Sequence, residues 1–239
     1  MRGPEVEREV DELAESVLGA LRVKTGKNGV DGDREFTLRS RSAGRNGGAE
    51  ARLAALRVLG VDALAPFVLA GRRADRDDVE LVRDSVLAFP APENDDGPPS
   101  LWSLRDRALA QVLRSLDSEV VFPVPEQAIA DARGDGLGWL PWCAEMARLS
   151  SLALPEIHGP WREAAARRRL DLARGVTRAI LRRDFLSAAR LARWQALDHA
   201  KHPDPNLSRA LNHMALLARG QARVLLEITV ATLLMEESR

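Results

Sequence analysis

The sequence is poor in cysteine, in aromatic residues and in lysine. It holds one cysteine, Cys143, and no tyrosine, and aromatic residues make up 4% of its 239 residues. A single cysteine excludes an intramolecular disulfide, so the disulfide framework of small secreted domains is missing. The scarcity of aromatic rings disfavours base-stacking RNA-binding domains, and no zinc-finger spacing is present.

Long hydrophobic runs are missing as well. The longest nearly uncharged stretch, 224–235, contains Glu227 and is shorter than the ~20 residues that cross a bilayer. The first residues, MRGPEVEREVDELAE, lack the apolar stretch of a secretory signal. We therefore expect a cytoplasmic protein without a transmembrane helix. Its 45% of apolar and 29% of charged residues are typical of a soluble globular chain.

Charge is balanced overall but unevenly placed. Residues 1–150 carry 20 basic and 26 acidic side chains, whereas residues 151–239 carry 15 and 9. The excess is largest in 161–225, where the net charge is +9. Because only 3 of the 35 basic residues are lysine, arginine stands at almost every cationic position. The identity of arginine alone is thus weak evidence for an anion-binding function.

The hydrophobic pattern predicts an all-α fold, a multi-helix bundle. Apolar residues recur at helical spacing in almost every segment, and only 35–38 and 119–122 are compatible with short strands. Pairs of short helices between 49 and 89 are similar in cadence to HEAT-type helical pairs. The likeness covers about forty residues, and we take it as a way of packing helices rather than as a family.

A break in periodicity predicts the domain organisation. The stretch PAPENDDGPPS combines proline, glycine and acidic residues without an apolar pattern, as linkers do. We expect an N-terminal helical subdomain at 1–89 with a glycine-rich loop at 25–48, a linker at 90–100, and a C-terminal helical bundle at 101–239. One continuous domain is the alternative.

Three long helices are expected at the C-terminal end, at 160–183, 184–201 and 205–237. Asp184 is an expected N-cap, and Asp204 followed by Pro205 has the composition of a helix start. The last helix is apolar nearly all round in its second half, so we expect a buried spine or a homodimer interface. In the N-terminal half, Gly60 and Gly71 are expected to end helices, and Asp62, and either Asp75 or Asp77, are expected to begin them.

The arginine-rich helix 161–183 carries the candidate binding residues. Arg174, Arg178 and Arg182 fall on one face, opposite an apolar one. An unpaired row of cations at ~6 Å spacing can follow the phosphates of a polyanion and gives salt-dependent affinity. A solvated helix face is the alternative interpretation.

The segment 194–206, WQALDHAKHPDPN, raises the question of a metal site. Asp198, His199 and His202 share about 100° of a helix, and His213 follows on the next helix. Zinc needs three or four ligands at ~2.0–2.1 Å. His202 and His213 are expected to be offset by ~11 Å along the helix axes, which is too far for both to bind one zinc ion without strain. His199 with His213 is the best remaining pair, and a helix end is the simpler interpretation. We expect no metal and no other cofactor.

Other catalytic patterns are incomplete. KTGKN lacks the spacing of a phosphate-binding loop, and GDGLG lacks the preceding strand of a dinucleotide site. Cys143 lies between tryptophans, as a buried cysteine would, and a pair with His158 lacks a third orienting residue.

Three functional hypotheses follow. The first is a non-enzymatic α-helical adaptor that binds another protein or a second copy of itself, without a membrane partner. The second is a protein that binds nucleic acid or another polyanion through helix 161–183. The third is a metal- or small-molecule-dependent enzyme built around His199, His202 and His213.

Overall fold

A computed structural model describes residues 3–24, 36–39, 46–92, 101–116 and 136–237. About 78% of these residues are helical and none forms a strand, which confirms the all-α prediction. The candidate strand at 119–122 lies outside the described residues. No helix among those described is long and apolar enough to cross a membrane. The chain divides into two compact units, Met1–Glu126 and Gln127–Arg239.

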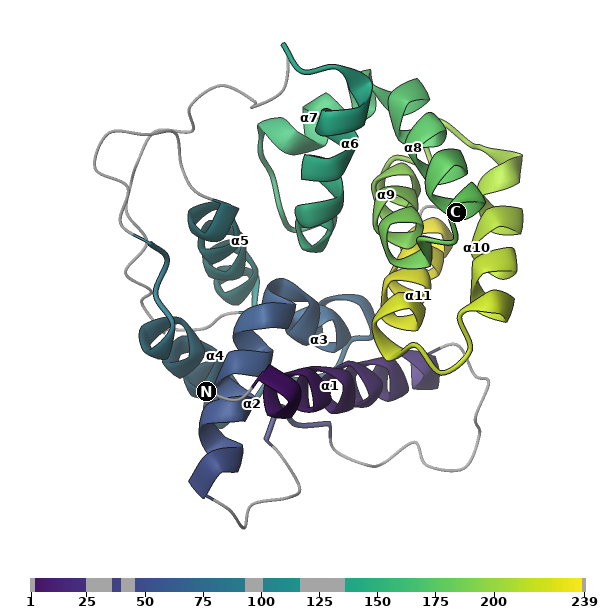
Figure 1. Ribbon diagram of the computed structural model, residues 1–239. Helices are drawn as coiled ribbons and strands as arrows, with labels where there is room; N and C mark the ends of the chain where they lie inside the picture. Colours follow the sequence, from purple (N-terminus) through teal and green to yellow (C-terminus); the bar gives the residue numbers. More distant parts are fainter. Residues whose placement is uncertain (1–2, 25–35, 40–45, 93–100, 117–135, 238–239) are drawn as a thin grey trace. The chain divides into compact units, whose positions relative to one another are not determined.

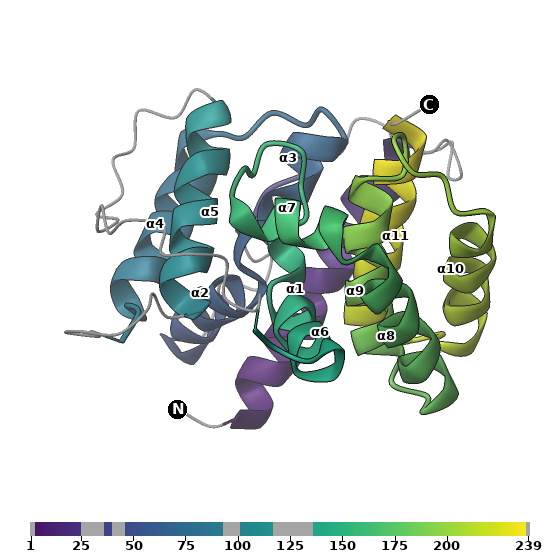
Figure 2. The same cartoon turned by 90° about the horizontal axis from the view of Figure 1, so that it is seen from above.

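The first unit is built on one long helix. Helix α1 (Gly3–Lys24) packs on α2 (Asn46–Leu59) and α3 (Ala65–Leu69), and α2 packs on α4 (Arg76–Ala88). A 3₁₀ turn, η1 (Gly60–Leu64), connects α2 to α3 and packs on α5 (Leu101–Ser115) (Figures 1 and 2). Side chains at helical spacing on α1 form the centre of this core, namely Leu13, Val17 and Leu21, all fully buried.

The expected helix boundaries in this unit are mostly confirmed. Gly60 and Gly71 follow the ends of helices, and the carboxylate of Asp75 accepts the Asp78 N–H at 2.7 Å as the N-cap of α4. The HEAT-like cadence of these helices stays a prediction.

The expected linker at 90–100 stays a prediction, because residues 93–100 lie outside the described residues. Helix α5 belongs to the first unit because Arg57 on α2 forms a paired hydrogen bond with the buried carboxylate of Asp106. Arg57 also donates to the Phe89 carbonyl at 2.7 Å. These contacts join α2, the end of α4 and α5 within the first unit, Met1–Glu126.

Within the glycine-rich loop expected at 25–48, residues 36–39 are described, and α2 already begins at Asn46. Leu38 is fully buried. Its N–H donates to Asp78 Oδ1 at 2.6 Å, and its carbonyl accepts from the Arg52 Nε at 2.9 Å. Arg52 in turn pairs with Glu9 at 3.0 Å. Two side chains therefore satisfy the main chain of Leu38 and fix it within the core.

The second unit is arranged around α9 (Phe185–Leu197). Helices α6 (Trp139–Arg148), α8 (Arg169–Leu181), α10 (Pro205–Leu217) and α11 (Ala222–Glu237) all pack against it, as does the short α7 (Pro160–Arg167) (Figure 1). Small residues on α9 allow this close approach, namely Ala188, Ala189, Ala192 and Ala196, each fully buried. The expected N-caps are confirmed, because Asp184 accepts the Ser187 N–H at 3.1 Å and Asp204 accepts the Asn206 N–H at 2.8 Å.

Two of the three long helices expected here are broken. The helix expected at 160–183 ends and restarts at Arg168. The helix expected at 205–237 is interrupted at Gly220, whose φ of 81° lies in the left-handed region that favours glycine. Each of these two expected helices is thus replaced by a pair of shorter ones, α7 with α8 and α10 with α11. The central helix of the unit is α9.

Helix α11 is nevertheless deeply buried. Leu226, Val230 and Leu234 are at most 2% exposed, whereas Leu225 is only half-buried. Glu227 on α11 pairs with Arg193 on α9 at 3.1 Å, and both side chains are buried. The expectation of a buried helix at 205–237 is therefore met by its second part, α11, within the second unit.

Candidate functional site

The inward face of α8 determines which residues reach the surface. Leu172, Val176 and Ala179 are buried. Gly175 lies so close to α6 and α9 that a Cβ there would be 2.8 Å from both Cys143 Sγ and Leu191 Cδ1. Packing of this inward face fixes the rotation of α8 about its axis. The residues on the opposite face are therefore the ones that point outward.

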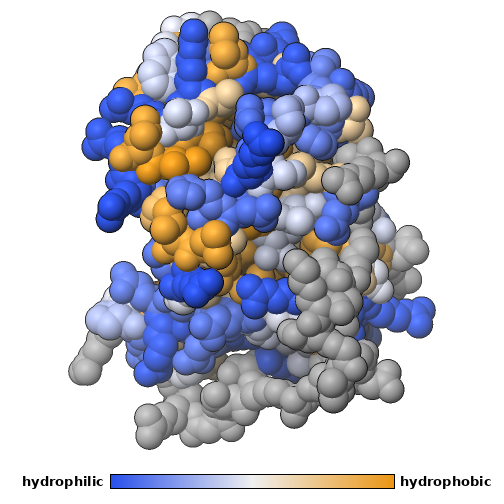
Figure 3. Space-filling view, turned by 90° about the vertical axis from the view of Figure 1, so that its right-hand side faces the viewer, coloured by the Kyte–Doolittle hydropathy of each residue, from blue (hydrophilic) through white to orange (hydrophobic). Residues whose placement is uncertain are grey.

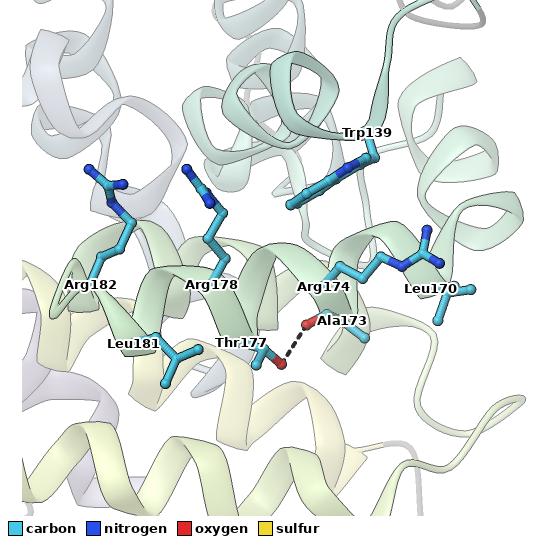
Figure 4. Close-up of a pocket in the computed structure, with 8 residues that line it drawn as sticks. All are labelled: Trp139, Leu170, Ala173, Arg174, Thr177, Arg178, Leu181 and Arg182. Carbon is cyan, nitrogen blue, oxygen red and sulfur yellow. Dashed lines mark hydrogen bonds between the residues drawn. The ribbon is translucent and has the colours of Figure 1, made fainter.

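A groove of about 600 Å³ runs along that outer face (Figure 4). Six of its eight lining residues come from α8, Arg182 directly follows the end of that helix, and Trp139 comes from the first turn of α6. They are Trp139, Leu170, Ala173, Arg174, Thr177, Arg178, Leu181 and Arg182.

The three arginines expected to form a cationic row all line this groove. Arg174 is ion-paired with Asp171 at 3.3 Å, so the expectation of three unpaired cations is wrong for this residue. Arg178 and Arg182 are exposed and have no ionic partner in the part of the chain that is described. In Figure 4 they extend side by side from one edge of α8, on the side where Trp139 lies. The row therefore offers two guanidinium groups that lack an ionic partner among the described residues.

Exposed leucines lie on the same face as the arginines. Leu170 is 64% exposed and Leu181 is 80% exposed. Thr177 and Ala173 lie between them along the helix. Figure 3, which views the molecule from the right-hand side of Figure 1, shows hydrophobic groups between hydrophilic ones on the face that it draws, and Figure 4 shows the leucines and arginines of the groove. The groove thus combines apolar and cationic surface within one helix face.

Trp139 is positioned by contacts around Arg168. The Arg168 guanidinium lies 4.4 Å from the ring of Trp142 and donates to the Leu137 carbonyl at 3.1 Å. It also pairs with Asp171 at 2.9 Å. The break between α7 and α8 therefore ties the start of α6 to α8, which places the Trp139 ring at the groove.

Helical periodicity in the sequence identified the arginines but not the leucines or Trp139. A signal for the leucines was present, since Leu170 and Leu181 are 11 residues apart and 11 steps return a helix to within about 20° of the starting direction. In an amphipathic helix the solvent face normally carries polar residues, so two leucines among the arginines are unusual. Trp139 could not be found in this way, because it joins the groove from another helix.

The histidines of the candidate metal site lie in the turn that follows α9 and on α10. His199 Nδ1 accepts the Asp204 N–H at 3.5 Å, and His202 Nε2 lies 3.7 Å from Asp198 Oδ2. His213 is exposed on α10. Across the described segments, no three His, Cys, Asp or Glu side chains are grouped so that they could hold a metal ion. Asp198, His199 and His202 therefore belong to the turn between α9 and α10.

Cys143 is a buried thiol. Its Sγ donates to the Asp171 carbonyl at 3.2 Å. Burial, reinforced by the charge of Asp171, raises the pKa of the Cys143 thiol to about 11. The thiol stays protonated near neutral pH and is a poor nucleophile.

No protein-family model, curated protein or solved structure matches this chain.

Proposed function

We propose that this chain is a non-enzymatic, cytoplasmic interaction protein that binds another macromolecule through the groove on α8. The observation that carries the proposal is the juxtaposition, on one outer helix face, of two highly exposed leucines and two arginines that have no ionic partner within the described segments. Exposed apolar patches rimmed by charged residues are typical of protein-binding surfaces.

The residue types favour recognition of a protein. Tryptophan and arginine are the side chains that most often contribute large shares of binding free energy at interfaces. Trp139 is half-buried, so part of its ring is available to a partner while the rest is held by the fold. A rigid helix that presents such groups loses little conformational entropy on binding.

The groove lining does not favour catalysis. Its polar groups are guanidiniums, one indole and the hydroxyl of Thr177, which donates to the Ala173 carbonyl at 2.9 Å. A nucleophile next to a general base is what covalent catalysis requires, and this lining contains no such pair.

The single thiol, Cys143, suits the reducing cytoplasm.

A second candidate function is binding of nucleic acid or another polyanion. The observation that favours it is a group of three exposed arginines at the C-terminal end of α8, namely Arg178, Arg182 and Arg183. None of them has an ionic partner in the described ranges. Phosphate contacts of this kind give affinity that falls with salt.

Site-specific photocrosslinking tests the proposal. A benzoylphenylalanine at Thr177, in the middle of the groove, is expected to capture a defined macromolecule in the cells that make the protein. The matched control is the same probe at Asn212, which is exposed on α10 outside the groove.

The captured species decides between the candidates. An adduct that forms only from position 177, resists nuclease and contains peptides of a second protein supports the protein-binding function, and an adduct that nuclease shortens supports the second candidate. Equal or absent crosslinking at both positions would contradict both.

A further inference from the structure

We infer that the groove on α8 accepts an amphipathic α-helix with an acidic flank, supplied by a partner protein. This inference rests on the proposed function and specifies the class of its partner. The spacing of the apolar groups, the spacing of the cations and the poorer fit of other occupants support it.

The apolar edge of the groove has helical spacing. Leu170, Ala173, Thr177 and Leu181 follow one another at intervals of three, four and four residues. They span roughly 16 Å of helix axis, about three turns. Apolar anchors at such intervals match the stripe of a second helix lying along the first.

The cationic edge calls for acidic residues on the partner. Arg178 and Arg182 are separated by four residues, or ~6 Å along the axis, which equals the separation of glutamates at positions i and i+4 of another helix. A guanidinium binds a carboxylate through two parallel N–H···O bonds. Arg174, already paired with Asp171, extends the row but offers less free charge.

An extended peptide fits this surface less well. A bound strand needs partners for its main-chain N–H and C=O groups, and it usually obtains them from the edge of a sheet. The outer face of α8 presents side chains only, since the main chain of a helix is hydrogen-bonded internally. A partner helix satisfies its own main chain and meets α8 with side chains alone.

A second copy of the chain and a nucleic acid are also less suitable. In a symmetric pair of α8 helices, Arg178 and Arg182 of each copy would face like charges, which is unfavourable. A nucleic acid would place phosphates and water beside Leu181, whose side chain is 80% exposed and gains little from them. An acidic amphipathic helix satisfies both edges.

Fluorescence anisotropy with a designed peptide tests the inference. The probe is a labelled helix of ~18 residues with leucines along one stripe and glutamates at i and i+4 beside it. Two control peptides each remove one property, with glutamine in place of glutamate or serine in place of leucine. Tight binding should require both properties.

Variants of the full-length protein locate the binding site. The double variant Arg178→Glu/Arg182→Glu should weaken binding of the acidic peptide by about tenfold or more. Leu181→Ser should also weaken it. Arg209→Glu and Leu216→Ser, which change exposed residues of α10 outside the groove, should leave affinity within about twofold of the original, a difference too small for a lost contact. Circular dichroism and thermal melting verify that all four variants fold.

Several outcomes would overturn the inference. They include equal binding of the acidic and glutamine peptides, unchanged affinity in the groove variants, and binding of single-stranded DNA, but not of the peptide, that is lost in those variants. Position-dependent crosslinking at Thr177 without peptide binding would leave the proposed function standing and refute only the acidic helix. Absence of both would refute both.

Discussion

At the scale of single residues, Gly175 is a point of close approach between α8 and its neighbours α6 and α9. A Cβ at this position would lie 2.8 Å from Cys143 Sγ and from Leu191 Cδ1, a distance that real side chains do not adopt. Glycine at 175 therefore allows α8 to pack on α6 and α9, and this packing directs the arginines and leucines outward.

Gly175→Ala should lower the free energy of unfolding by about 1–3 kcal/mol, because the added methyl group overpacks a buried contact. Gly19→Ala is the matched control. Gly19 is exposed on α1, and a methyl group there would meet no atom within 4 Å, so alanine should raise stability by about 0.5–1 kcal/mol. Urea unfolding measures both, and equal stability of the two variants would contradict the packing described here.

Asp78 should make the stability of the protein depend on pH. Burial raises the pKa of the Asp78 carboxyl, although hydrogen bonds from Leu38 and Thr37 act against the shift. The folded chain then takes up a proton at a higher pH than the unfolded chain. As pH rises through the folded-state pKa, stability is lost, and as pH falls toward the ordinary value of about 4 it is regained.

Asp78→Asn keeps an oxygen acceptor and cannot titrate. Unfolding free energies measured from neutral pH down to the ordinary aspartate pKa of about 4 should show the original protein gaining stability relative to the variant as pH falls. Parallel curves for the two proteins would show that the pKa of Asp78 is not raised.

Hydrogen bonds between residues close in the sequence could be predicted from it, and those between residues far apart in the sequence could not. The caps at Asp75, Asp184 and Asp204 were predictable because each accepts a hydrogen bond from a residue two or three positions later. Leu38 is 40 residues from Asp78, and nothing in the sequence around it indicates that contact.

At the scale of elements, α9 and α11 are joined by a buried ionic network. Arg193, fully buried on α9, pairs with Glu227 and donates to the Ala153 carbonyl at 3.1 Å. Glu227 also accepts from Ser150 Oγ at 3.0 Å and from Arg190 at 3.1 Å. The network holds the turn at η2 (Ser150–Leu152) against the two central helices.

Arg193→Ala should destabilise the protein by about 3–5 kcal/mol, because it leaves the Glu227 carboxylate buried with fewer partners. Arg209→Ala, at an exposed position of α10, should change stability by less than about 0.5 kcal/mol. Thermal and chemical unfolding provide the comparison. A loss below about 1 kcal/mol for Arg193→Ala, within the range of an ordinary substitution, would mean that the network contributes little.

Helix periodicity predicted where the elements lie but not where they break. The pattern of 160–183 is continuous across Arg168, and the break there depends on Trp142 and the Leu137 carbonyl, which come from another segment. Gly220 was a local signal for the break between α10 and α11, although the apolar residues on either side suggested one helix.

At the scale of the whole molecule, net charge separates along the chain. Residues 1–126 carry 18 basic and 23 acidic side chains, and residues 127–239 carry 17 and 12. The first unit therefore has a net charge of −5 and the second of +5. The groove on α8 belongs to the basic unit, which favours an acidic partner.

Heparin affinity tests how far this charge supports the second candidate function. The chain as a whole is neutral and the groove offers two free arginines, so we expect no retention at about 0.15 M salt. Strong retention at that salt, abolished by Arg178→Glu/Arg182→Glu, would favour binding of a polyanion over binding of a protein.

The site itself was predictable in part. The arginines could be placed on one face from helical periodicity alone. Their combination with Trp139 required the packing of α6 on α8, and the free state of Arg178 and Arg182 required knowing which acidic residues lie near them. Because both depend on contacts between separate segments, the sequence led to three functional hypotheses and the fold to one proposed surface.

The central claim is that the outer face of α8 is a binding surface for an acidic helix. Methyl NMR of the leucines during titration with the designed acidic peptide tests it most directly. The signals of Leu170 and Leu181 are expected to shift together and to saturate, while those of Leu216 and Leu217, exposed on α10 outside the groove, stay in place. Shifts confined to Leu216 and Leu217, or no shift at any of the four, would contradict the claim.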